Sequence, residues 1–182
     1  MRRNYISIII PYFKKKEFFS DCFNSVYNQT YRKKEIIIVY DDNDLSDVDY
    51  IKKIIKNKKN TFLFINKKNK GVGQSRNFAI KKSKGEFLAF IDSDDLWNKK
   101  KLEIQIKFMK NKNILASFTS YSVINSFGKT IGFREANKVI TLKDLRYSCD
   151  IGLSTVVIKR TKKINNIIRF PDLKTKEDYV LW

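Results

Sequence analysis

The stretch Gly85-Glu-Phe-Leu-Ala-Phe-Ile-Asp92-Ser-Asp94-Asp95 indicates both a fold and a site. Its first half, from Glu86 to Ile91, is a short apolar run that predicts a buried strand. Its second half ends on clustered carboxylates, which repel one another and therefore favour a cation. Mg²⁺ takes oxygen ligands and often shares its shell with substrate phosphates. The alternative is an Asp-rich turn in which Asp94 or Asp95 caps a following helix.

Strands and helices alternate on both sides of this stretch. The pattern predicts strands at 6–10, 35–40, 61–65 and 86–91, and helices at 17–29, 48–55, 74–82 and 102–109. Such alternation favours an α/β sheet with right-handed crossovers. The strands are continuous apolar runs, as expected where helices cover both faces of the sheet. Their carboxyl ends form the functional edge and carry Pro11-Tyr12, Asp41-Asp42 and Asp92-Ser-Asp94.

The pattern changes after Asn113. Short strands are expected at 114–120, 121–124, 130–134 and 155–158, with a short helix at 141–146 and the start of another at 177–182. The chain stops within that last apolar run, so its C-terminus looks cut short. A length of 182 residues predicts one domain.

The composition excludes several kinds of chemistry. The sequence has no His, which removes Ser-His-Asp and Cys-His nucleophile systems and most zinc sites. Cys22 and Cys149 form no metal-type cluster, and we interpret both as reduced and intracellular. No apolar run is long enough to span a bilayer, and the N-terminus lacks a signal-peptide core. These features predict a cytoplasmic protein.

The net charge of +19 has two interpretations. It could indicate a nucleic-acid partner or an anionic membrane surface. Lys, Ile and Asn are abundant throughout, however, and the basic residues are spread from end to end, which favours a general composition bias. No nucleic-acid module is recognisable, so no nucleic-acid partner is expected. Peripheral contact with an anionic membrane at the cytoplasmic face remains an expectation.

Three groups of motifs, in order and at similar spacing, resemble the inverting family-2 glycosyltransferases. They are Ser7 to Phe13 with Ser25 to Tyr31 and Glu35 to Asp42; Asn69 to Asn77 with Gly85 to Asp95; and Lys176 to Trp182. The resemblance implies the GT-A fold, a Rossmann-like, mixed and mainly parallel sheet flanked by helices. It divides the single domain into a nucleotide-binding half, 1–112, and an acceptor half, 113–182. Tyr40 and Asp44 depart from the usual family pattern, and the family's chains normally continue past Trp182.

The resemblance assigns the donor side of the site. It implies that Asp94, in a D-x-D motif, binds Mn²⁺ or Mg²⁺, that Asp92 and Ser93 lie by the nucleotide-sugar, and that Asp95 supports them. A nucleotide-sugar donor carries a diphosphate, so a metal would offset its charge and stabilise the leaving group.

The same resemblance assigns the base pocket and the diphosphate contacts. Tyr12 would stack on the base, Pro11 would shape the pocket, and Asp42 would accept a hydrogen bond from an imide N–H, which favours uracil. Lys70 and Arg76 are the candidate positive charges near the diphosphate, and Gly71 and Gly73 would let the backbone approach it. Three alternatives stay open: Tyr12 could be a core residue, Asp41-Asp42 a plain strand-end turn, and the glycines a turn cap.

The acceptor hydroxyl needs a general base, and without His a carboxylate is the natural choice. Resemblance assigns this role to Asp178, although Glu177 and Asp178 could also be acids favoured by a helix dipole. The expected function is a metal-dependent inverting transfer of a sugar from a nucleotide-sugar, with a UDP-sugar as the expected donor, to a surface-polysaccharide or lipid-linked acceptor. The alternatives are an inactive nucleotide-binding relative that serves as a partner subunit, and a basic surface binder.

Overall fold

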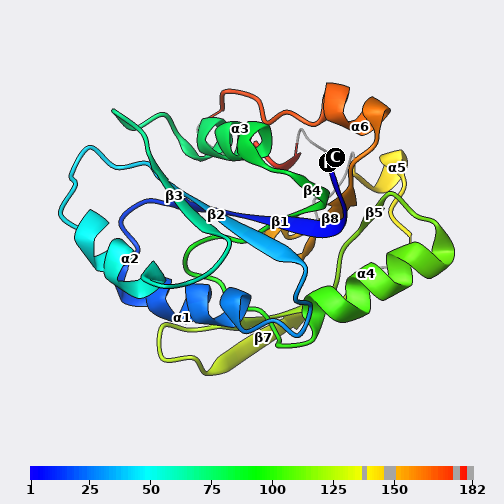
Figure 1. Cartoon of the computed structure of the whole chain (residues 1–182). Helices are drawn as coiled ribbons and strands as arrows, with labels where there is room; N and C mark the ends of the chain where they lie inside the picture. The colour runs from blue at the N-terminus through cyan, green and yellow to red at the C-terminus, as the bar shows by residue number, and fades with distance from the viewer. Residues whose placement is uncertain (137–138, 146–150, 174–176, 180–182) are drawn as a thin grey trace.

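A six-stranded sheet forms the centre of the computed structural model, which describes residues 1–136, 139–145, 151–173 and 177–179 (Figure 1). The strand order is β3-β2-β1-β4-β8-β5. The bounds are β1 Arg2–Tyr12, β2 Lys34–Tyr40, β3 Thr61–Ile65, β4 Gly85–Phe90, β5 Ala116–Ser117 and β8 Val157–Lys159. The first four strands are parallel, whereas β8 is antiparallel to both β4 and β5. The predicted α/β fold with a mixed, mainly parallel sheet is confirmed.

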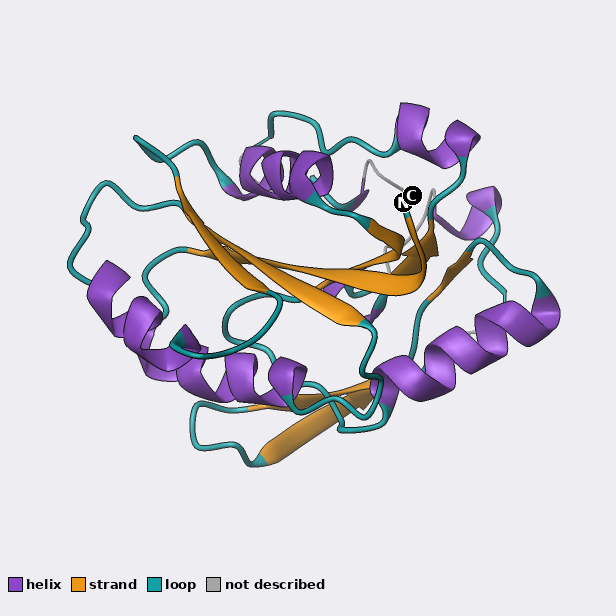
Figure 2. Cartoon of the chain, viewed as in Figure 1, coloured by secondary structure: helices purple, strands orange, loops and turns teal. Residues whose placement is uncertain are grey.

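Helices cover both faces of this sheet (Figure 2). Helices α1 (Lys16–Tyr27), α2 (Val48–Ile55) and α4 (Lys101–Lys112) lie on one face, and α3 (Val72–Lys82) and α6 (Lys162–Ile167) lie on the other. Each face has its own apolar core, because successive residues of a strand point to opposite sides. Within the described part of the chain, no helix is both long and apolar enough to cross a membrane.

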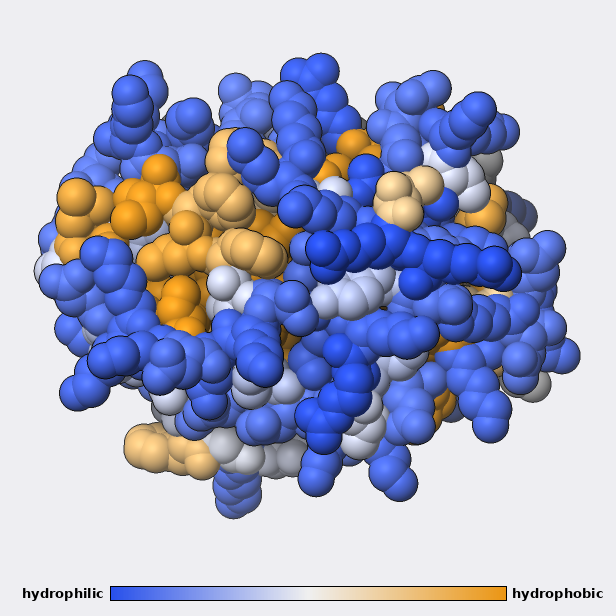
Figure 3. Space-filling view, in the orientation of Figure 1, coloured by the Kyte–Doolittle hydropathy of each residue, from blue (hydrophilic) through white to orange (hydrophobic). Residues whose placement is uncertain are grey.

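The second half also contains smaller elements outside the six-stranded sheet. A separate hairpin consists of β6 (Tyr121–Ile124) and β7 (Thr130–Arg134), and α5 (Leu142–Leu145) and the 3-10 turn η1 (Leu153–Thr155) follow it. The face shown in Figure 3 is mostly hydrophilic, but apolar side chains gather where the edge strand β3 lies. Phe62 and Ile65 of that strand are exposed.

The first strand is longer than predicted and continues through Pro11. The N–H of Ile6 and the carbonyl of Tyr12 bond toward the β2 side of the strand, to Lys33 and Asp41. Pro11 therefore faces the β4 side, where the pairing of β1 ends at Ile9. The missing proline N–H removes no ladder bond at that position, so the strand does not have to stop.

Other predictions in the second half were wrong in detail. The strand expected at 114–120 has only the two residues of β5, and the one expected at 155–158 is divided between η1 and β8. Helix α6 was not predicted. Neither Asp94 nor Asp95 caps a helix, because α4 begins at Lys101.

Candidate functional site

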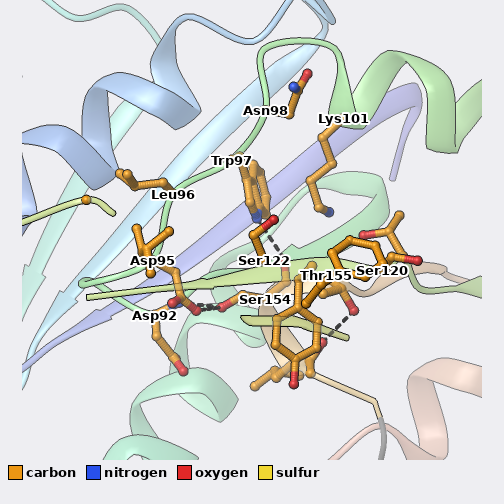
Figure 4. A pocket seen from close by; sticks show the side chains of 17 residues that line it. Asp92, Asp95, Leu96, Trp97, Asn98, Lys101, Ser120, Ser122, Ser154 and Thr155 are labelled. Atoms are coloured by element: carbon orange, nitrogen blue, oxygen red, sulfur yellow. Dashed lines mark hydrogen bonds between the residues drawn. The ribbon is translucent and has the colours of Figure 1, made fainter. Parts of the chain in front are cut away.

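The acidic cluster follows β4 directly, and Ser154 of η1 holds it in place. The N–H of Asp92 donates to Ser154 Oγ at 3.1 Å, and that hydroxyl donates to a carboxylate oxygen of Asp95 (Figure 4). Ser93, between the acids, is buried. Burial raises the pKa of Asp95, the hydrogen bond from Ser154 opposes this, and the charges of Asp92 and Asp94 add to it. The crowded carboxylates favour a cation, as the sequence predicts.

Asp94 presents its carboxylate to solvent beside Lys15. Its Oδ2 lies 2.9 Å from Lys15 Nζ, and the two side chains are 37% and 43% exposed. The hydrogen bond to Asp94 raises the pKa of Lys15. A pair this exposed contributes only about 0–1 kcal/mol, so a divalent ion can displace Lys15 at little cost.

The donor set around Asp94 fits a metal shared with a substrate. In residues 1–136, 139–145, 151–173 and 177–179, no three acidic or sulfur side chains form a ready metal cage. Mg²⁺ does not require one, because it is usually bound by one or two carboxylates together with phosphates and water. Asp94 can therefore hold such an ion if a diphosphate supplies further oxygens.

Arg76 of α3 links the acidic cluster to the C-terminal segment. Its Nη2 donates to Asp92 Oδ1 at 2.6 Å, and its Nη1 donates to Glu177 Oε1. The guanidinium is buried and lies 5.3 Å from the centre of the Phe170 ring. Arg76 was predicted to lie near a diphosphate; in this structure its charge is already shared by two carboxylates.

Asn77 and Gly73 hold the segment that leads to Glu177. The Asn77 amide exchanges two hydrogen bonds with the backbone of Phe170, at 2.8 and 2.9 Å. A Cβ on Gly73 would lie only 2.9 Å from the carbonyl oxygen of Pro171. Gly73 thus allows the chain, rather than a ligand, to approach α3 closely.

Asp178, the candidate general base, is next to the Arg76 partner Glu177. Burial and then the charge of Glu177 raise the pKa of Asp178, while the N–H of Tyr179 donates to its Oδ1 at 2.9 Å and opposes the shift. A raised pKa suits a carboxylate that must accept a proton. The helix predicted from 177 onwards lies mostly outside the described residues, which here show a turn at 177–179.

Tyr12 lies in the core, which corrects its predicted place beside a base. Because β1 continues through Pro11, strand alternation points Tyr12 to the same face as Ile8 and Ile10, and its ring is fully buried against Tyr40 at 5.1 Å. Its hydroxyl donates to Asp47 Oδ2 at 2.6 Å. Tyr12 is therefore a core residue, which was the alternative interpretation of the sequence.

Phe13 and Asp42, which follow the carboxyl ends of β1 and β2, are the candidate groups for contact with a base at this edge of the sheet. Phe13 follows β1 directly and is 47% exposed. Asp42 is largely buried and accepts a hydrogen bond from the N–H of Asp44 at 3.2 Å. It lines a polar cavity of about 470 Å³, together with Lys14, Lys16, Glu17, Asp44, Ser46 and Asp47.

The glycine loop is fixed by Asp41. Asp41 Oδ1 accepts hydrogen bonds from the Lys70 N–H at 2.9 Å and from the Asn66 side chain at 2.7 Å. Gly71 has φ +84°, a conformation that favours glycine, and is the N-cap of α3. The Lys70 side chain is exposed. The loop is therefore shaped as a turn cap and leaves the Lys70 ammonium free to reach an anion at this edge.

A cavity of about 630 Å³ lies between the acidic cluster, α4 and the β6–β7 hairpin. Its lining includes Asp92, Asp95, Trp97, Lys101, Tyr121 and Ser154. Lys101, Lys15, Phe13 and Ser154 are functional candidates that were not predicted from the sequence. Ser154 and Lys101 carry no local motif that marks them, whereas Phe13 could have been found by continuing the strand alternation past Pro11.

Comparison with known proteins identifies relatives of the whole chain. The model of the family described as glycosyl transferase family 2 matches residues 7–161. An uncharacterized glycosyltransferase of Rickettsia felis is 37% identical over 97% of this chain and 29% of its own length. The Escherichia coli protein WfgD, a UDP-Glc:alpha-D-GlcNAc-diphosphoundecaprenol beta-1,3-glucosyltransferase, is 37% identical over 97% of this chain and 68% of its own.

Solved structures share the fold. Staphylococcus aureus TarS 1–349 in complex with UDP-GlcNAc has a TM-score of 0.80 at 25% identity, over 97% of this chain and 52% of that one. The mannosyltransferase PcManGT of Pyrobaculum calidifontis, in complex with GDP-Man and Mn²⁺, has a TM-score of 0.70 at 15% identity, over 94% and 48%. The chain thus spans between 29% and 68% of the length of these relatives.

Proposed function

We propose a function for this chain on the premise that it belongs to glycosyl transferase family 2. The function is transfer of a sugar from a UDP-sugar to a surface-polysaccharide or lipid-linked acceptor, with inversion at the anomeric carbon. The observation that carries it is the Arg76 bridge, which brings the C-terminal acids to the acidic cluster after β4. A donor-binding group and a general base thereby share one site.

The donor nucleotide binds at the ends of β1 and β2. Asp42 accepts the imide N–H of uracil, and Pro11 shapes the backbone beside it. Because Tyr12 is fully buried and Phe13 is exposed, we assign the stacking contact with the base to Phe13. The Lys70 ammonium, held by the loop that Gly71 caps, neutralises part of the diphosphate charge.

Asp94 holds the metal ion, Mn²⁺ or Mg²⁺, while Asp92 and Ser93 lie by the ribose. When bound, the ion offsets the negative charge of the diphosphate, including the charge that develops on the leaving group. Before the ion binds, Lys15 supplies the positive charge beside Asp94, and the ion then displaces it. The relative PcManGT, whose fold is similar, was solved with Mn²⁺.

Asp178 accepts the proton of the acceptor hydroxyl. The oxygen then forms a bond to the anomeric carbon as the bond to the diphosphate breaks, and the electron pair of that bond leaves with UDP. A single displacement of this kind inverts the anomeric configuration. The raised pKa of Asp178 increases its proton affinity at the moment of attack.

The acceptor is assigned from chemistry and from relatives. WfgD acts on a diphosphoundecaprenol-linked sugar, and TarS was solved with a UDP-sugar. A net charge of +19 suits peripheral contact with an anionic membrane at the cytoplasmic face. We keep the division into a nucleotide-binding half, 1–112, and an acceptor half, 113–182, within one domain.

Calorimetric titration of UDP, with and without Mn²⁺ and at two salt concentrations, tests the donor assignment. We expect metal-dependent binding that survives moderate salt. Binding that ignores the metal and fades with salt would reflect a generic basic surface instead. Metal-dependent binding without hydrolysis or transfer of any UDP-sugar would favour a nucleotide-binding partner subunit.

A further inference from the structure

The cavity of about 630 Å³ beside the acidic cluster has one feature that the proposed donor chemistry does not use. Lys101, from the first turn of α4, points into it (Figure 4). The hairpin β6–β7 and η1 form its other walls, with Ser120, Ser122 and Thr155 among the lining residues. The volume falls in the range of about 300–1,000 Å³ that is usual for small-molecule sites.

The Lys101 ammonium has only neutral partners among the described residues. Its Nζ donates to Gln105 Oε1 at 3.0 Å and lies 4.2 Å from the centre of the Trp97 ring. The Gln105 amide nitrogen donates to two backbone carbonyls, of Ser117 and Thr155, which leaves its oxygen to accept from Lys101. An ammonium has three donors, and Gln105 takes one of them.

Burial without a counter-charge disfavours the charged form of this lysine. Burial alone lowers the pKa of Lys101 to about 7. The two acids that line the same cavity are already engaged, Asp92 with Arg76 and Asp95 with Ser154. An anion entering the cavity would supply the missing charge and accept the remaining donors, as phosphate oxygens do in charge-assisted hydrogen bonds.

We propose that Lys101 and the hydroxyls of the same cavity bind a phosphate group carried by the acceptor sugar. This inference rests on the proposed function, because it names the class of acceptor for that site. Lys101 is a binding residue that selects an acceptor and takes no part in proton transfer. In Figure 4, Lys101 lies on the side of the cavity away from Asp92 and Asp95.

The test measures binding of three probes to the protein saturated with UDP and Mn²⁺, so that the donor site is filled. The probes are N-acetylglucosamine 1-phosphate, methyl N-acetylglucosaminide and inorganic phosphate. We expect the sugar phosphate to bind about tenfold more tightly than the neutral sugar, as one charge-assisted contact implies. It should also bind more tightly than inorganic phosphate. Binding of the sugar phosphate no tighter than that of either other probe would overturn the proposal.

The variant Lys101→Met should bind the sugar phosphate no better than the neutral sugar. Lys99→Met, which removes the same charge from an exposed neighbour, should keep the discrimination. Loss of discrimination in both variants would mean a general charge effect and would contradict a specific site.

A measurement on the unaltered protein covers the case in which Lys101→Met does not fold. The ammonium signal of Lys101, followed by NMR against pH, should titrate at higher pH when the sugar phosphate is bound and stay unchanged with the neutral sugar. An unchanged titration with both probes would refute the contact. Failure of UDP to bind in the first place would instead refute the proposed function.

Discussion

Replacing Arg76 by Met removes the cation that two carboxylates share. The Arg76 side chain is 3% exposed and that of Glu177 is 9%, so this half of the bridge is shielded from water. The Asp92 side chain is 44% exposed, and its contribution is discounted because solvent screens it. Removing one partner of a buried pair costs about 3–5 kcal/mol, and the exposed second half places the expected loss near the lower end, about 3 kcal/mol.

Urea unfolding followed by circular dichroism measures this loss of free energy. For a chain of this size, about 3 kcal/mol corresponds to a decrease in Tm of roughly 6–12 °C. Arg169→Met, at an exposed position, is the matched control and should change stability by less than about 0.5 kcal/mol.

A second substitution separates the ion pair from simple packing. Adding Glu177→Gln to Arg76→Met neutralises the buried carboxylate that the first change leaves without a partner. The double variant should therefore be more stable than Arg76→Met alone. A loss below 1 kcal/mol in Arg76→Met, or no recovery in the double variant, would refute the bridge as a stabilising contact.

Three further predictions concern the site. Asp94→Ala should abolish metal-dependent UDP binding in calorimetry, whereas Asp49→Ala, which removes an exposed helix acid, should not; unchanged binding in Asp94→Ala would contradict the metal assignment. Asp178→Asn should bind UDP normally and lose transfer, and equal transfer rates in the variant and the unaltered protein would exclude Asp178 as the general base. The unaltered protein should lose transfer as pH falls through the raised pKa of Asp178, because the base is then protonated. Gly73→Ala should lower the free energy of unfolding in urea by about 1–3 kcal/mol, because the added methyl would meet the carbonyl oxygen of Pro171. An unchanged free energy would mean that the segment around Pro171 does not pack this closely against Gly73.

The strands of the first half were predictable because their burial is local in sequence. Continuous apolar runs mark β2 and β4, which helices cover on both faces, and their carboxyl ends place Asp42 and Asp92 at one edge. The short elements β5 and β8 have two and three residues, too few for any period to be recognised. Their pairing with β4 and with each other defines them, and that pairing is tertiary.

The sequence predicts a list of candidate site residues, but it does not predict the contacts among them. The acidic cluster at Asp92 follows from one local stretch. The partnership of Arg76 with Glu177 joins residues 101 positions apart, and no local pattern contains it. Tyr12 points into the core because β1 continues past Pro11. The strand can continue there because the pairing of β4 with β1 already ends at Ile9, and this is a tertiary feature that the local sequence does not contain.

The bridge at Arg76 also has a consequence for the order of events at this edge of the sheet. One guanidinium pairs with Asp92 of the acidic cluster and with Glu177 beside Asp178. A ligand that competes for Asp92 changes the share of positive charge that Glu177 receives, and Asp178 lies next to that charge. By thermodynamic reciprocity, a second ligand whose affinity depends on that charge changes the affinity of the first ligand by the same factor as the first changes its own. Under the proposed function, donor binding at Asp92 and proton transfer at Asp178 are therefore coupled through Arg76.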